Sequence, residues 1–178
     1  LGLQTKHAVQ ESREIIAKQL NCKAEEIIFT SGGTESINLA IKGVALKKGK
    51  GHIITSKIEH PAVLETCKYL ERKGFTVTYL EVNKFGLISL KDLERAIKSN
   101  TILISIMYAN NEIGTIEPIK EIGRIAKKNK ILFHTDACQS YTKTNIDVKK
   151  QNLSLVTLNA HKIHGPKGVG ALFIRENV

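Results

Sequence analysis

Hydrophobic and polar positions along the chain follow two periods. Short apolar runs of four to seven residues recur, and between them apolar residues return every three or four positions. Apolar runs of this length are typical of buried strands, and the three-to-four spacing is typical of helices that bury one face. The sequence therefore predicts seven strands, at 26–30, 52–55, 76–82, 102–107, 131–134, 153–158 and 168–174.

Proline and serine mark where several of the predicted helices begin. Pro61 and Pro118 suit a first helical turn, because proline lacks the N–H that this turn leaves unpaired. Ser89, with Asp92 three residues later, forms a capping-box pattern. The helices that begin at Thr34, Pro61, Ser89 and Pro118 are expected to bury, in that order, Ile37, Ile41 and Val44; Val63, Cys67 and Leu70; Leu90, Leu93 and Ile97; and Ile119, Ile122 and Ala126.

Strands that alternate with helices predict an α/β fold of three layers, in which helices cover both faces of a mostly parallel sheet of about seven strands. The loop at 165–168 is too short for a parallel crossover, so the seventh strand should run antiparallel. No internal repeat or linker divides the chain, and residues 1–178 are expected to form a single domain. The first helix, roughly 4–20, has no strand before it, which is unusual for a complete fold.

Composition is that of a globular domain, with 42% hydrophobic residues and only 3 prolines. The net charge of +10 raises the question of nucleic-acid binding. However, the 22 lysines far outnumber the 5 arginines and sit mostly singly on expected outer helix faces, and only 9 aromatics are present for stacking. We therefore expect a solvated lysine-rich surface and no nucleic-acid partner. No apolar run approaches the ~20 residues of a membrane span, so no membrane association is expected.

The three cysteines, Cys22, Cys67 and Cys138, are widely spaced and odd in number. They form neither a disulfide framework nor a zinc-site spacing, so no metal is expected. No signal-peptide pattern opens the chain. A reducing compartment fits best, which means the cytoplasm, or an organelle matrix in a eukaryote.

Polar residues follow five of the strands at the point where each strand ends. In open α/β sheets, ligands bind beyond the carboxyl ends of the strands, so these residues should converge on one edge of the sheet. They are Ser31 to Thr34 after the first strand, Glu59 and His60 after the second, Asn110 to Glu112 after the fourth, Asp136 and Gln139 after the fifth, and His161 and Lys162 after the sixth.

The turn after the first strand has the composition of an anion site. Gly32 and Gly33 would let the backbone approach an anion, the following helix would supply free N–H groups, and Thr34 would add a hydroxyl donor. The segment is not a phosphate-binding loop of the Walker type, because no Lys-Ser/Thr pair follows the glycines. For a lone Gly-Gly-Thr, an ordinary tight turn is the favoured alternative.

Asp136 and Lys162 are the two charged residues that point most clearly to chemistry. Asp136 follows an apolar strand, so its carboxylate needs a cationic or N–H partner, such as the protonated ring nitrogen of a cofactor. A helix N-cap or a structural ion pair is the alternative for Asp136. Lys162 follows another apolar strand and precedes a glycine loop, which suits an amine nucleophile. A solvated surface lysine is the alternative, and Lys167 in the loop is the rival for this role.

The ordered set of motifs decides between these alternatives. Five segments, in this order and at close to this spacing, resemble those of the cysteine desulfurases, a family of class-V aminotransferase-like enzymes that use pyridoxal 5'-phosphate (PLP). These segments are 29–40, 59–63, 110–114, 134–140 and 160–168. The resemblance covers essentially the whole chain and implies the large domain of a fold type I (aspartate-aminotransferase-like) PLP enzyme.

The resemblance also implies roles for individual residues. Lys162 would hold PLP as a Schiff base, Asp136 would pair with the pyridine nitrogen, and His60 would stack on the ring and shuttle protons. Asparagine stands at position 159, where the family usually has a serine that donates to the phosphate; its amide can still donate. The remaining expected contacts are Gln139 and Asn111 near the ring, and Gly33, Thr34 and His161 at the phosphate.

The activity that the resemblance implies is removal of sulfur from L-cysteine, which gives L-alanine and an enzyme persulfide for iron–sulfur cluster or thio-cofactor synthesis. A homodimer and a sulfur-acceptor or iron–sulfur scaffold protein are the implied partners. A selenocysteine lyase, or another class-V relative, is the enzymatic alternative.

A catalytically inactive PLP-binding fragment is the other alternative. The family's nucleophilic cysteine follows the Schiff-base lysine, whereas no cysteine follows Lys162 here. The family's N-terminal segment, and the small C-terminal domain with its substrate-binding arginine, are expected to be absent. We interpret Cys138, beside Asp136, as a packing residue.

Overall fold

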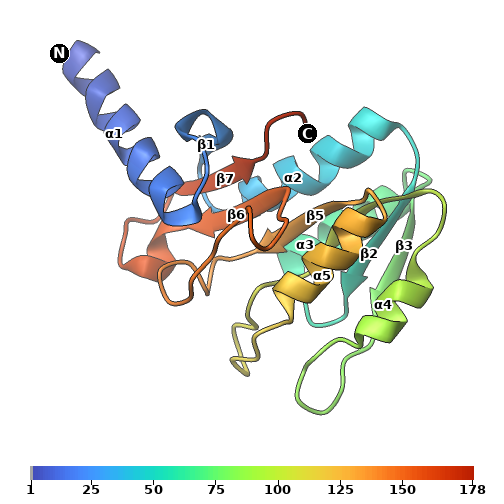
Figure 1. The fold of residues 1–178 in the computed structure, drawn as a ribbon. Coiled ribbons are helices and arrows are strands. Elements are labelled where there is room, and N and C mark those ends of the chain that lie inside the picture. The colour runs from blue at the N-terminus through green and yellow to red at the C-terminus, as the bar shows by residue number, and fades with distance from the viewer. Residues whose placement is uncertain (1) are drawn as a thin grey trace.

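The computed structural model of the chain describes residues 2–178. Seven strands form one sheet in the order β1-β7-β6-β5-β4-β2-β3 (Figure 1). β7 pairs antiparallel with both of its neighbours, and all other neighbours pair in parallel, so the predicted antiparallel seventh strand is confirmed. The strands are β1 (Ile27–Thr30), β2 (His52–Ser56), β3 (Thr76–Leu80), β4 (Thr101–Ser105), β5 (Leu132–Asp136), β6 (Leu155–Asn159) and β7 (Gly170–Ile174).

Helices cover both faces of the sheet, which confirms the predicted three-layer α/β architecture. α2 and α3 pack on one face, whereas α4, α5 and the end of α1 pack on the other (Figure 1). The α-helices are α1 (Gly2–Leu20), α2 (Gly33–Lys48), α3 (Pro61–Glu71), α4 (Leu90–Ala96) and α5 (Ile119–Lys128). Two 3-10 helices complete the described elements, η1 (Ala24–Glu26) and η2 (Ala160–Ile163).

Central strands place successive side chains in two different cores. Ile53 and Leu103 pack with α2 and α3, while their neighbours Ile54 and Ile104 pack with α4 and α5. Because side chains alternate across a sheet, a strand covered on both faces must be apolar at consecutive positions. This requirement explains the nearly continuous apolar runs of the sequence.

The predicted helix starts are close to those observed. Pro61 is the first residue of α3, and Ser89 caps α4 by accepting a hydrogen bond of 3.3 Å from the Asp92 N–H. Pro118 is the cap of α5, one residue before its first turn. The predicted face of α4 is only partly correct, since Ile97 follows the helix in extended backbone with ψ of 127°.

α1 projects from the rest of the fold (Figure 1). Only Ala17 and Leu20, in its last turn, are buried. Arg13 fixes the helix to β1, because its Nε donates to the Ile27 carbonyl at 3.1 Å and its guanidinium lies 5.3 Å from the centre of the Phe29 ring. No helix within residues 2–178 combines the length and the hydropathy that crossing a membrane requires.

Candidate functional site

The ends of five strands surround a cavity of about 270 Å³. β1, β2, β4, β5 and β6 all run in one direction, so the segments that follow them meet at one edge of the sheet. All nine residues selected from the sequence line this cavity: Gly33, Thr34, His60, Asn111, Asp136, Gln139, Asn159, His161 and Lys162. The other lining residues are Ile37, Met107, Ala109 and Cys138.

Of these four additional residues, Met107 could have been found from the sequence. It is the last residue of an apolar run, and the residues that end a strand face the ligand edge. Ile37 is predicted to be buried, and it is only 1% exposed in the core beneath α2 as well as lining the cavity. Cys138 is interpreted as a packing residue beside Asp136, and periodicity alone does not specify that either side chain reaches the cavity.

The turn between β1 and α2 strongly favours glycine. Gly32 has a φ of +151°, which side-chain-bearing residues rarely adopt. A Cβ atom on Gly33 would lie 2.9 Å from Cys138 Sγ and 3.2 Å from Asn159 Nδ2. The backbone therefore lies directly against the cavity wall, and the first N–H groups of α2 have no partner within the helix. Such a turn suits an anion.

Asp136 ends β5 and is only 8% exposed. Its Oδ1 accepts a hydrogen bond of 3.0 Å from the Cys138 N–H, and its backbone carbonyl accepts one of 2.9 Å from the Tyr108 N–H. None of the ion pairs within residues 2–178 includes this carboxylate. The Asp136 carboxylate is thus a buried acceptor on the cavity wall to which the described chain offers no cation at salt-bridge distance.

Lys162 and His161 lie on η2, which starts directly after β6. Both side chains are exposed and line the cavity, whereas the rival Lys167 does not line it. His164 ends η2 in the left-handed region with φ of +63°, and the Gly165 N–H donates to the Ala160 carbonyl at 2.9 Å. This turn directs the chain back into β7 and leaves the Lys162 amine at the cavity.

His60 and Asn111 are exposed residues held by the backbone on either side of them. His60 is the cap of α3, and its Nδ1 accepts from the Ala62 N–H at 3.1 Å, so Nε2 is the ring nitrogen that remains for a ligand. The neighbouring Asn110 side chain donates to the Ile58 carbonyl at 3.1 Å and accepts from the Ile113 N–H at 3.0 Å. Asn110 therefore ties the loop that carries Asn111 to the loop that carries His60.

Asn159 contributes an unsatisfied polar atom to the wall. Its Oδ1 is buried and has no hydrogen-bond partner within the described chain. Buried polar atoms are rarely left unpaired in folded proteins, so Asn159 Oδ1 is an acceptor that a donor group of a bound ligand or a water would satisfy.

The cysteine thiols are poor nucleophiles in this fold. Burial, together with the nearby Asp136 carboxylate, raises the pKa of the Cys138 thiol far above its ordinary value. Burial also raises the pKa of Cys67 and of Cys22 to about 12. Because the thiolate is the reactive form, thiols with raised pKa values react poorly near neutral pH, which agrees with the interpretation of Cys138 as a packing residue.

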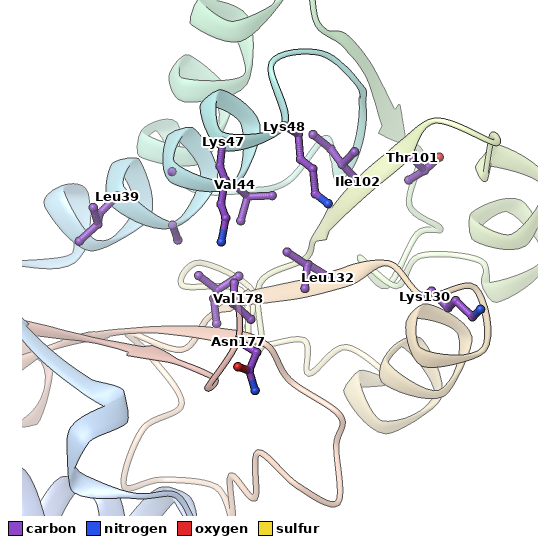
Figure 2. Close-up of a pocket in the computed structure, with 13 residues that line it drawn as sticks. Leu39, Val44, Lys47, Lys48, Thr101, Ile102, Lys130, Leu132, Asn177 and Val178 are labelled. Carbon is purple, nitrogen blue, oxygen red and sulfur yellow. The ribbon is translucent and has the colours of Figure 1, made fainter.

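A larger cavity, of about 420 Å³, lies at the other end of the strands (Figure 2). Figure 2 shows Lys47 and Lys48 of α2 beside it, with Ile102 and Leu132 from the first halves of β4 and β5. None of the nine selected residues lines it, and its titratable side chains are lysines alone. The smaller cavity is the candidate site, because it combines a glycine turn that suits an anion, a carboxylate, two histidines and an amine. No group of three or more potential metal ligands occurs in the described part of the chain.

Comparison with known proteins gives a consistent result. The family model for aminotransferase class-V matches residues 1–178. The cysteine desulfurase IscS of Methanosarcina thermophila is 58% identical over 181 residues, which cover 100% of this chain and 45% of that protein. The mitochondrial cysteine desulfurase of Saccharomyces cerevisiae is 53% identical over 98% of this chain and 35% of its own length. The chain thus spans less than half the length of these relatives.

Solved structures agree in fold. The structure titled SspA in complex with cysteine superposes with a TM-score of 0.97 at 50% identity, over 98% of this chain and 51% of that one. A NifS-like protein superposes with a TM-score of 0.95 at 46% identity, over 99% of this chain and 50% of that one.

Proposed function

The chain belongs to the aminotransferase class-V family, and on this basis we propose that the whole protein is a PLP-dependent cysteine desulfurase. The reaction cleaves the carbon–sulfur bond of L-cysteine and moves the sulfur to an enzyme cysteine. L-cysteine and an enzyme thiol thereby give L-alanine and an enzyme persulfide, which supplies iron–sulfur cluster or thio-cofactor synthesis. The observation that carries this proposal is the single cavity that gathers all nine selected residues, in a chain 58% identical to a cysteine desulfurase.

The groups around the cavity fit PLP. The glycine turn at Gly33 and Thr34, with His161 and the Nδ2 amide group of Asn159 as a donor, would take the phosphate. Asp136 has no cation at salt-bridge distance among the described residues and would take the protonated ring nitrogen. When bound, PLP supplies an electron sink that stabilises negative charge at the α-carbon of an amino acid.

Each residue at the cavity would then have a separate role toward the cofactor. The Lys162 amine would bind the cofactor covalently and would exchange a proton at Nζ with the substrate. His60 would cover the ring and could hold a proton only at Nε2, because its Nδ1 already accepts from the Ala62 N–H. Asn111 and Gln139 would orient the ring from its edges.

The nucleophilic cysteine is proposed to lie outside these 178 residues. The thiols of Cys22, Cys67 and Cys138 all have raised pKa values, which is the opposite of what a sulfur-accepting thiolate requires. We therefore expect the chain alone, as the large domain, to bind PLP without turnover. Other proposed properties of the whole protein are a homodimeric state, a sulfur-acceptor partner and a reducing compartment, the last supported by three unpaired cysteines.

The test is to supply the whole protein, loaded with PLP, with L-cysteine and to measure alanine and protein-bound persulfide. Equal amounts of both products are expected, and the K162A variant should abolish them. K167A is the matched control, since Lys167 is a nearby exposed lysine that does not line the cavity. Absence of alanine from the wild type would contradict the proposal, and a strong preference for L-selenocysteine would favour the lyase alternative.

A further inference from the structure

A buried carboxyl group, Glu59, lies next to the cavity without lining it. The residue follows β2 and directly precedes His60, and it is only 4% exposed. A buried carboxyl of this kind is costly to the fold unless it is hydrogen-bonded. Its partners therefore indicate what it contributes.

Both hydrogen bonds of Glu59 converge on one oxygen. Oε1 accepts from the Ser56 hydroxyl at 2.7 Å and from the Met107 N–H at 2.9 Å, while Oε2 is buried without a partner within residues 2–178. Ser56 ends β2, and Met107 lies just beyond β4 and lines the cavity. The carboxyl thus connects the loop before α3 to the end of the neighbouring strand.

We propose that Glu59 is a positioning residue, whose carboxyl holds the β2–α3 loop against the end of β4 and so fixes His60 at the cavity wall. Its effect on PLP rests on the proposed function, because His60 is expected to cover the cofactor ring. The hydrogen bonds of the Glu59 carboxyl are separate from the one at the neighbouring Ile58, whose backbone carbonyl accepts from the Asn110 side chain at 3.1 Å.

The protonation of Glu59 suits this role. Burial raises its pKa to about 8, and the carboxylates of Asp136 and Glu117 add to this effect. Near neutral pH a protonated Glu59 can hold both hydrogen bonds without placing a second negative charge close to Asp136. Two charged carboxylates in one site would repel each other.

Glu117 provides a matched control for the experiment. It is also buried, at 3% exposed, and one oxygen accepts from the Ile88 N–H at 3.2 Å while the other has no partner within the described chain. Burial raises the pKa of Glu117 to about 7. Like Glu59, it does not line the cavity. The two residues therefore differ mainly in the N–H group that each accepts from: Met107, which lines the cavity, for Glu59, and Ile88, which does not, for Glu117.

The experiment measures the dissociation constant of PLP for the whole protein, from the absorbance of apoprotein titrated with PLP, together with the melting temperature. E59M keeps the volume but removes the acceptor and should weaken binding by about tenfold, the effect of losing one or two hydrogen bonds. E59Q keeps an oxygen acceptor and should restore binding to within about threefold of the wild type. E117M should lower the melting temperature about as much as E59M does, but it should leave PLP affinity unchanged.

A double-mutant cycle with H60A distinguishes positioning from general destabilisation. If Glu59 acts through His60, adding E59M to H60A should weaken PLP binding by less than about twofold further. If E59M does not fold, S56A, which removes one of the two donors, replaces it in the same cycle.

Wild-type affinity in E59M, or in S56A where that variant replaces it, would overturn the proposal. Equal weakening in E117M, or fully independent effects in the cycle, would also overturn it. Failure of the wild-type protein to bind PLP would instead contradict the proposed function.

Discussion

At the scale of single residues, the cavity depends on how closely backbone and side chains can approach one another. Gly170 on β7 shows this as clearly as Gly33 does, because a Cβ atom there would lie 2.6 Å from Gly32 Cα and 2.9 Å from the Leu158 carbonyl oxygen. The glycine turn is therefore seated against β7 and β6 with no room for side chains. Gly33 and Thr34, at the start of α2, line the cavity in this position.

Replacing Gly33 by alanine should damage the site directly. The added methyl would meet Cys138 Sγ at 2.9 Å, so we expect ~1–3 kcal/mol of destabilisation from overpacking and weaker PLP binding. Gly43 in the same helix is the matched control, because a Cβ there meets nothing within 4 Å. G43A should stabilise the protein by ~0.5–1 kcal/mol. Denaturant unfolding and PLP titration would check both, and similar behaviour of the two variants would contradict the account.

His134 makes stability depend on pH. It is fully buried on β5, between the Ser105 hydroxyl at 2.8 Å and the Thr157 hydroxyl at 2.9 Å, and burial lowers its pKa to about 3. Between pH 3 and the ordinary value of 6.5, the folded state therefore binds fewer protons at His134 than the unfolded state does. The contribution of neutral His134 to the free energy of unfolding is complete above pH 6.5. It is lost as the pH falls, by at most ~1.4 kcal/mol per pH unit.

The comparison to make is wild type against H134Q, with the free energy of unfolding measured by denaturant between about pH 4 and 7. Other buried groups, such as His52 with its pKa lowered to about 4 by burial and by Lys98, affect both proteins and largely cancel. The wild type should lose stability more steeply than the variant on acidification. Parallel pH dependences would show that His134 does not titrate as described.

The sequence selected most of the residues that line the cavity, but not the residues that support them. All of the nine selected residues except Asn159 lie in segments that follow apolar strands, and the family motifs then gave each of them a role. The sequence shows Glu59 only as a polar residue after a strand, whereas its burial and its hydrogen bond from the Met107 N–H depend on β2 lying beside β4. Such a contact between residues 48 positions apart leaves no local signal in the sequence.

At the scale of elements, helix starts were more predictable than helix ends. Starts depend on one or two residues, such as Ser89 with Asp92, whose hydrogen bond is local. α4 ends at Ala96 although the apolar spacing continues to Ile97, because the backbone there turns extended toward β4. Periodicity records which residues are apolar, whereas the end of a helix depends on where the next strand must enter the sheet.

Removal of the α4 cap should affect stability and not the site. S89A loses the acceptor for the Asp92 N–H, which should cost ~1 kcal/mol. Neither α4 nor its cap lines the cavity, so PLP affinity should match that of the wild type. Unfolding by urea and PLP titration of the same samples would check this, and a change in PLP affinity would contradict the separation of α4 from the site.

At the scale of the whole molecule, the strand order is what brings distant segments together. β1 pairs with β7 at one end of the sheet, while β2 lies between β3 and β4. The three-layer class and the antiparallel β7 could be predicted from alternation and loop length, but this order could not, because many orders satisfy the same alternation. Six of the seven strands, all except β7, run in the same direction, so their carboxyl ends lie at one edge of the sheet. Residues from position 33 to position 162 meet at this edge.

The central claim is that this edge binds PLP through Lys162. The most direct measurement is to load the whole protein with PLP, reduce it with borohydride and map the modified peptides by mass spectrometry. The account predicts one pyridoxyl group per chain, on Lys162, and none on Lys167. A modification on Lys167, or one scattered over many lysines, would contradict it, as would the absence of any adduct.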